Sequence, residues 1–257
     1  MESLYRKYNH REFVHPDPLE FLYRYDDIRD REIAGLIASV LAYGKVKQIL
    51  RSVGTVLDKM ESPREFLEKL SKASILKTFS GFRHRFTTGE KSALLLYGVK
   101  KVNEKYGSLE ACFMKGFSDE DENVYRALEK FALALYANAG LEYCHILPMP
   151  CYGSACKRLN LFLRWMVRRD EVDPGGWYNV HPRKLIVPLD THMHKIGLAL
   201  GLTGRKQADF RAALDLTNMF KTITPDDPVR YDFALTRLGI RDDCDPAEII
   251  GKQNTCS

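Results

Sequence analysis

Apolar residues recur at helical spacing along nearly the whole chain. The first clear run has an i, i+3, i+4, i+7, i+8 pattern, made by Ile33, Leu36, Ile37, Val40 and Leu41. This spacing puts them on one face of a helix, with Asp30 as a candidate N-cap. A second run covers residues 46–60, and Tyr43-Gly44 predicts a tight turn between the two. The same period predicts further helices at roughly 65–78, 90–105, 122–138, 154–169, 191–201, 206–219 and 228–238.

Strand signals are few. Residues 184–189 read Lys-Leu-Ile-Val-Pro-Leu, which predicts a short extended piece, and its proline argues against a central strand. Residues 170–182 contain Pro174-Gly175-Gly176 and form the clearest predicted loop. The pattern therefore predicts an all-α fold.

Composition narrows the class of protein only slightly. The 257 residues include 45% hydrophobic ones, enough for a sizeable core, and no apolar run is long enough for a membrane span. Residues 1–9 carry charges and no apolar stretch, so we expect a cytoplasmic protein, nucleoid-associated if prokaryotic. The formal net charge of +5 and the isoelectric point near 8.8 fit a nucleic-acid binder as well as many other proteins. No CxxC pair occurs among six cysteines, so we expect mostly buried thiols, with no metal and no cofactor.

The segment from Met149 to Leu202 carries the candidate chemistry. Two prolines and Gly153 enforce a sharp turn, after which Ser154 can cap the next helix and Lys157 falls in its first turn. Asp190 follows Val-Pro-Leu and is a candidate N-cap for the helix after that.

A lysine and an aspartate at helix starts suit covalent catalysis. The positive end of the helix dipole disfavours a second positive charge, and a lysine kept partly neutral can attack a sugar C1′ and form a Schiff base. An ionised Asp190 could stabilise an oxocarbenium-like transition state or take a proton from Lys157. The plain alternatives are a surface lysine and a structural cap, both common.

These residues resemble the helix–hairpin–helix (HhH-GPD) DNA glycosylase superfamily. The resemblance lies in Pro150-x-x-Gly153, the lysine that opens the next helix, and Val187-Pro-Leu-Asp190-Thr-His. The common branch has its lysine where this chain has Ala155, and the gap from Lys157 to Asp190 is longer here. The sequence is therefore more similar to the archaeal 8-oxoguanine DNA glycosylase branch and its uncharacterised microbial relatives.

The resemblance implies two helical lobes with a DNA and base cleft between them, containing a helix–hairpin–helix motif. Residues 1–30 plus 136–257 would form the lobe with the lysine and aspartate, and residues 31–135 a barrel-like lobe. It also implies a base-excision repair glycosylase with AP lyase activity, acting on 8-oxoguanine. The partner would be double-stranded DNA with a damaged base, bound by a monomer with no membrane contact.

The resemblance also assigns roles to individual residues. Lys157 and Asp190 would be catalytic, and Asp232 would line the base pocket, although Thr236 replaces an aromatic one turn later. Trp165 falls in an apolar helix and is expected in the core. The expected DNA contacts are Gly153, Ser154, Arg158, His192 and Lys195, and the other base-pocket candidates are Tyr231 and Trp177. Basic residues near this face could hold phosphates: Arg164, Arg168, Arg169, Arg183 and Lys184.

Two other functions remain open. The first is a non-catalytic helix–hairpin–helix protein that binds DNA or RNA. The second is a metal-dependent all-α hydrolase using His192, His194 and Asp190. The i, i+2 spacing of the histidines on a helix points them to different sides, which argues against joint metal ligation.

Overall fold

The computed structural model describes residues 1–240 of the chain, with side chains up to residue 237, and is mostly helical. This confirms the all-α expectation at the level of secondary structure. The α-helices are α1 Glu2–Tyr8, α2 Ile28–Val40, α3 Val46–Leu57, α4 Pro63–Lys69, α5 Lys72–Phe79, α6 Gly89–Tyr106, α7 Leu109–Met114, α8 Tyr125–Ala139, α9 Lys157–Val167, α10 Thr191–Ala199, α11 Phe210–Ile223 and α12 Asp232–Ile240. The 3-10 turns are η1 Arg11–Phe13, η2 Pro18–Arg24, η3 Pro150–Tyr152 and η4 Pro182–Lys184, and the strands are β1 Arg83–His84 and β2 Thr87–Thr88.

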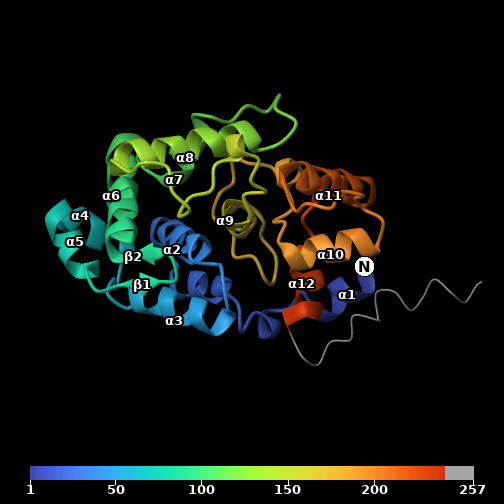
Figure 1. Ribbon diagram of the computed structural model, residues 1–257, viewed down its shortest axis with the longest axis horizontal. Coiled ribbons are helices and arrows are strands. Elements are labelled where there is room, and N and C mark those ends of the chain that lie inside the picture. Colours follow the sequence, from blue (N-terminus) through green and yellow to red (C-terminus); the bar gives the residue numbers. More distant parts are fainter. Residues whose placement is uncertain (241–257) are drawn as a thin grey trace, which may run out of the picture.

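Helix α9 occupies the middle of the molecule. Figure 1 shows α2–α8 on one side of it and α10–α12 with α1 on the other. Helix α2 packs against α9, α6 against α5 and α8, and α1 against α12. The extents of the two sequence-predicted lobes remain a prediction, and residues 241–257, with Cys244 and Cys256, lie outside the described residues.

Most helices predicted from periodicity are present with shifted ends. Helix α2 begins after Asp27, whose side chain accepts from the amide of Arg29, so Asp30 is not the N-cap. Asp30 instead accepts from Ser62 Oγ and from the amide of Arg64, both at 2.8 Å, and so joins α2 to the start of α4. The predicted helix at 65–78 is two helices, because Ser71 starts a new one by accepting from Ser74.

Some elements escaped the pattern because they are short. Helices α1 and α7 have 7 and 6 residues, and each strand of the β1–β2 hairpin has 2. Residues 184–189 belong to no strand: Lys184 ends the η4 turn and residues 185–189 follow it as coil.

Buried aromatic residues hold the centre together. Trp165 is fully buried on α9, which confirms its expected place in the core. Trp177, in the loop before η4, packs against Phe113, Phe131 and Phe162, which come from α7, α8 and α9. None of the described helices is both long enough and apolar enough to cross a membrane.

Candidate active site

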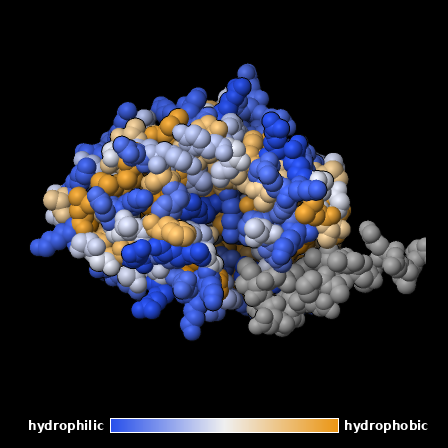
Figure 2. All heavy atoms as spheres, viewed as in Figure 1, coloured by the Kyte–Doolittle hydropathy of each residue, from blue (hydrophilic) through white to orange (hydrophobic). Residues whose placement is uncertain are grey.

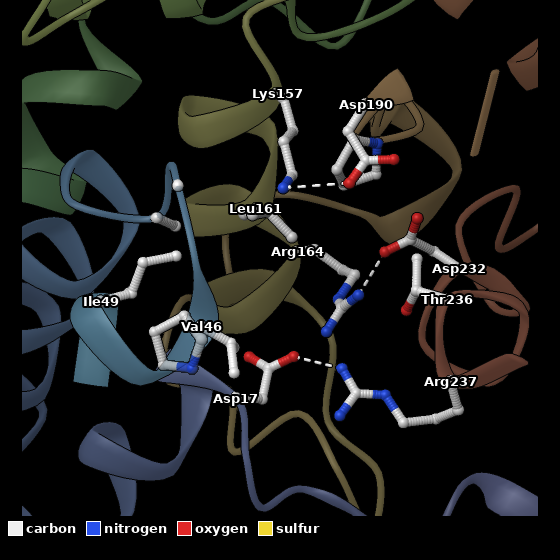
Figure 3. Close-up of a pocket in the computed structure, with 14 residues that line it drawn as sticks. Asp17, Val46, Ile49, Lys157, Leu161, Arg164, Asp190, Asp232, Thr236 and Arg237 are labelled. Atoms are coloured by element: carbon white, nitrogen blue, oxygen red, sulfur yellow. Dashed lines mark hydrogen bonds and ion pairs between the residues drawn. The ribbon is translucent and has the colours of Figure 1, made fainter. Parts of the chain in front are cut away.

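A pocket of about 270 Å³ lies where α9, α10 and α12 meet the α2–α3 turn and η2 (Figure 3). We call it the Lys157 pocket. Apolar side chains form one part of its wall and charged ones another. Its lining is Asp17, Pro18, Ala42, Gly44, Val46, Ile49, Lys157, Leu161, Arg164, Pro188, Asp190, Asp232, Thr236 and Arg237.

The turn before α9 places Lys157 at the first residue of that helix. Gly153 and Cys156 both have left-handed backbone conformations, with φ of 75° and 48°. The predicted cap was wrong in position: α9 starts at Lys157 rather than near residue 154, and Cys156 is its N-cap residue. Ser154 Oγ accepts from the amide of Cys156 at 3.1 Å and so shapes the turn instead.

Asp190 is the N-cap of α10, as predicted, and its two oxygens face different partners. Oδ1 accepts from the amides of His192 and Met193 at 2.9 and 2.8 Å. Oδ2 lies 3.1 Å from Lys157 Nζ, so the two residues singled out from the sequence meet in space. Their side chains are 33% and 28% exposed, which leaves both groups partly open to solvent.

The carboxyl group of Asp190 is held in its ionised form. Burial acts to raise its pKa, but the Lys157 ammonium and the amide of Met193 outweigh burial, so the pKa is lowered. The site therefore pairs a carboxylate with an amine at the edge of a pocket.

A buried ion pair lies deeper in the Lys157 pocket. Arg164 on α9 donates to Asp232 Oδ2 on α12 and also contacts Asp173 at 3.2 Å. Asp232 Oδ1 is buried and has no hydrogen-bond partner. Burial raises the pKa of Asp232 to about 6 although Arg164 acts to lower it. Asp232, which was expected in the pocket, thus brings an unsatisfied polar atom to its lining.

Lys157, Leu161 and Arg164 lie on one face of α9. They are spaced i, i+4, i+7, which puts successive side chains above one another along a helix. All three line the pocket. The helical period of the sequence could have found this stripe once Lys157 was singled out. Asp17 and Arg237, which pair at 2.5 Å across the pocket floor, carry no such local signal.

Three predicted contacts are not where the sequence suggested. Trp177 is only 1% exposed and its indole N–H donates to Glu32, so this residue is in the core rather than in a base pocket. Tyr231 is 4% exposed, donates to Glu2, and does not line the Lys157 pocket. Arg158 donates to the carbonyls of residues 40, 145 and 146, so its guanidinium joins α9 to two other segments instead of facing a phosphate.

The remaining predicted DNA contacts have mixed surroundings. Gly153 and Lys195 are exposed, and Ser154 is half-buried. His192 is half-buried beside Asp190, and its Nε2 is buried without a hydrogen-bond partner. His194 is buried, with Nε2 2.8 Å from the carbonyl oxygen of Arg205.

Several of the predicted phosphate-binding residues are structural. Arg164 and Arg168 are buried in ion pairs with aspartates, and Lys184 is buried against the carbonyls of Asp119 and Asp121. Arg169 and Arg183 are exposed. The positive charge near the loop therefore mainly stabilises the fold.

The side chains do not form a metal site of the kind considered from sequence. Within residues 1–240, no group of three or more His, Cys, Asp or Glu side chains is arranged to hold a metal ion. Since His194 is bound to a backbone carbonyl, His192, His194 and Asp190 do not make a joint ligand set. Of the described cysteines, Cys112 and Cys156 are buried thiols, Cys144 is half-buried and Cys151 is exposed.

Comparison with known protein families assigns the chain to one family. Residues 17–241 match the family described as "Protein of unknown function (DUF2400)", and because this match covers most of the chain, the protein belongs to that family. No helix–hairpin–helix glycosylase family is detected, so the family membership suggested by the resemblance was wrong. No curated protein and no solved structure matches the chain.

Proposed function

We propose that this protein is a DNA base-excision enzyme, a glycosylase with AP lyase activity that uses Lys157 as nucleophile and Asp190 as its partner. The observation that carries the proposal is the 3.1 Å contact between Lys157 Nζ and Asp190 Oδ2 at the edge of the Lys157 pocket. The proposal rests on this geometry and not on family membership. A lysine with an adjacent base is one of the arrangements that can form a Schiff base, and here the carboxylate of Asp190 is that base.

Each residue has a defined step in this chemistry. Asp190, ionised at neutral pH, accepts the proton that the Lys157 ammonium loses and stabilises positive charge that develops at C1′. The free amine forms a bond to C1′, the glycosidic bond breaks, and its electron pair leaves with the base, which takes a proton from solvent. The C1′–O4′ bond then breaks as the nitrogen lone pair forms the C1′=N bond of the Schiff base, and the proton that the nitrogen has lost ends on O4′. Loss of a C2′ proton to solvent then breaks the C3′–O bond, so the 3′ phosphate leaves with its electron pair and the strand is cut.

The lining of the pocket suits a nucleobase. Val46, Ile49 and Leu161 offer apolar contacts for a flat ring, while Arg164 and Asp232 offer polar groups for its edge. Asp232 Oδ1 can accept from an N–H donor of a base, which would satisfy an otherwise unpaired buried oxygen. 8-oxoguanine has an N–H where guanine has an acceptor, so it is the first substrate to test. A nucleotide in duplex DNA must leave the stack to reach such a pocket.

Borohydride trapping tests the proposal directly. Wild-type protein is incubated with duplex DNA holding one 8-oxoguanine opposite cytosine, and with the same duplex holding an abasic site. We expect a covalent adduct with wild type, none with Lys157→Gln, and a wild-type yield with Lys77→Gln, which changes an exposed lysine on α5. An adduct of equal yield in Lys157→Gln, or none with any damaged or abasic duplex, contradicts the proposal.

A nucleic-acid-binding protein without chemistry is the second candidate. The same ion pair also joins α9 to the start of α10, which is an ordinary structural role. This candidate predicts DNA or RNA binding, no adduct with any lesion, and unchanged affinity in Lys157→Gln. Base release revealed by alkali, without an adduct, would instead indicate a glycosylase that works through Asp190 alone.

A further inference from the structure

A short hairpin stands beside the Lys157 pocket. Strands β1 and β2 pair antiparallel, with Arg83 opposite Thr88 and His84 opposite Thr87, so Arg85 and Phe86 form its two-residue tip. Arg85 has φ of 53°, a left-handed backbone conformation that residues other than glycine seldom adopt. Because this conformation is unfavourable, the contacts of the rest of the hairpin must hold the backbone of the tip in place.

The base of the hairpin is anchored at both strands. His84 is buried, with Nδ1 2.8 Å from Ser52 Oγ and Nε2 3.1 Å from the carbonyl of Tyr43. Burial lowers the pKa of His84, which keeps its ring neutral between these partners. Thr87 is fully buried, and its Oγ1 lies 2.7 Å from the hydroxyl of Tyr43 and 3.1 Å from His145 Nε2. The tip thus projects from a rigid support.

Phe86 at the tip is 69% exposed, the highest value among the large hydrophobic side chains in the described part of the chain. Its ring touches His145 edge to face, and the Arg85 guanidinium lies 5.6 Å from its centroid. An aromatic side chain in this position lacks the burial that stabilises such residues in a core. It is available to stack on another flat group.

The surroundings of the tip are basic. Arg51, Arg83 and Arg85 line a groove of about 460 Å³ between the hairpin and α3, and Lys45 and Lys47 are exposed at the start of α3. Within residues 1–240, none of these five residues forms an ion pair with an acidic side chain. Figure 2 shows a mainly hydrophilic surface over α3 and the hairpin, with hydrophobic residues among it. The charge suits a polyanion.

The hairpin is joined to the pocket through Gly44. This residue lines the Lys157 pocket, and a Cβ added to it would lie 2.7 Å from Arg85 Nη1. The Arg85 side chain therefore lies against Gly44, which is itself part of the pocket lining. A strand whose backbone follows the basic groove would bring a nucleotide to this part of the pocket.

We propose that the hairpin of residues 83–88 is a nucleic-acid wedge: Phe86 inserts into the base stack of duplex DNA at the place left by the nucleotide that enters the Lys157 pocket, and Arg51, Arg83 and Arg85 contact the flanking phosphates. The entry of a nucleotide into the Lys157 pocket rests on the proposed function. The insertion of Phe86 into the base stack is a separate claim about DNA binding. Apolar and aromatic side chains that enter between base steps unstack them, and a stacked aromatic contributes strongly to affinity.

The test uses a duplex with 2-aminopurine next to the lesion, because this base fluoresces when it is unstacked. The variants are Phe86→Ala, Phe86→Trp and, as a matched control, Tyr178→Ala. Tyr178 is 68% exposed in the loop before η4. We expect wild type, Phe86→Trp and Tyr178→Ala to raise the fluorescence on binding. Phe86→Ala is expected to bind about 10-fold more weakly and to give no rise at saturation.

Separate readouts distinguish the two proposals. If both hold, excision from the duplex falls at least 10-fold in Phe86→Ala, while borohydride trapping on a single-stranded abasic oligonucleotide stays within about 3-fold of wild type. A Phe86-dependent fluorescence rise with no trapping by wild type on any substrate would overturn the enzyme and keep the wedge. Trapping by wild type with equal fluorescence in Phe86→Ala and wild type would overturn the wedge and keep the enzyme. Thermal unfolding of Phe86→Ala checks that the hairpin is intact.

Discussion

At the scale of single residues, Asp190 combines a structural and a chemical role on different oxygens. Oδ1 caps α10 and Oδ2 faces Lys157. Asparagine is as good an N-cap as aspartate, since its amide oxygen can accept from the same amides. The substitution Asp190→Asn therefore separates the charge from the cap.

We predict that Asp190→Asn keeps the fold and loses the chemistry. Its free energy of unfolding should change by less than about 1 kcal/mol, while the rate of adduct formation falls about 100-fold or more. Urea denaturation and single-turnover trapping measure the two effects. Asp209→Asn, at the N-cap of α11, is the matched control, and its trapping rate should equal that of wild type. Equal trapping rates in Asp190→Asn and wild type would remove Asp190 from the mechanism.

At the scale of elements, Glu32 joins three segments that are distant in sequence. From α2 it accepts from the amides of Leu109 and Glu110 at the start of α7, at 3.0 and 3.2 Å, and from Trp177 Nε1 at 3.1 Å. Burial raises the pKa of Glu32 from 4.5 to about 7 although these three donors act to lower it. The folded protein therefore binds a proton here more tightly than the unfolded chain.

This shift predicts a pH-dependent stability. Because the folded pKa is the higher one, the contribution is complete below about pH 4.5 and is lost as the pH rises through 7. Wild type should lose about 2–3 kcal/mol more than Glu32→Gln between pH 4.5 and 8 in urea denaturation. Parallel pH curves for the two proteins would show that folding does not shift the pKa of Glu32.

The elements also show what the sequence can predict. Lys157 and Asp190 could be found because helix starts leave local signals, such as a turn followed by a polar residue and an apolar run. Trp177 was misplaced because a polar, glycine-rich loop says nothing of the three aromatic residues from α7, α8 and α9 that enclose it. The hairpin was missed because two-residue strands are too short to show alternation.

At the scale of the whole molecule, the basic residues behind the net charge of +5 fall into a buried group and an exposed group. Among the described residues, the buried arginines Arg164, Arg168 and Arg237 are paired with aspartates. The exposed basic residues around the hairpin and α3 are therefore among the charges that can act on a partner. The composition alone could not separate these two populations.

We predict a steep salt dependence of DNA affinity. If about four phosphates are neutralised, affinity should fall roughly 100-fold between 50 and 200 mM salt. The double variant Lys47→Gln/Arg51→Gln should reduce the slope of log K against log salt by about 2, as measured by fluorescence anisotropy. Lys77→Gln on α5 should leave the slope unchanged. A slope near zero in wild type would exclude this surface as the main DNA contact.

The stripe on α9 has a consequence for what the pocket can accept. Lys157 and Arg164 are seven residues apart on one rigid helix, so their backbones are separated by about 10 Å along the axis. The helix therefore fixes the distance between the amine of Lys157 and the guanidinium of Arg164. A ligand that contacts both Lys157 and Arg164 has the length of a nucleoside rather than of a free sugar or a small aldehyde. Inserting one residue between Lys157 and Arg164 would lengthen the distance between them, and deleting one would shorten it. Either change would also turn Arg164 by about 100° around the helix axis. The pocket would then no longer select its ligand by size, although both functional groups would be unaltered.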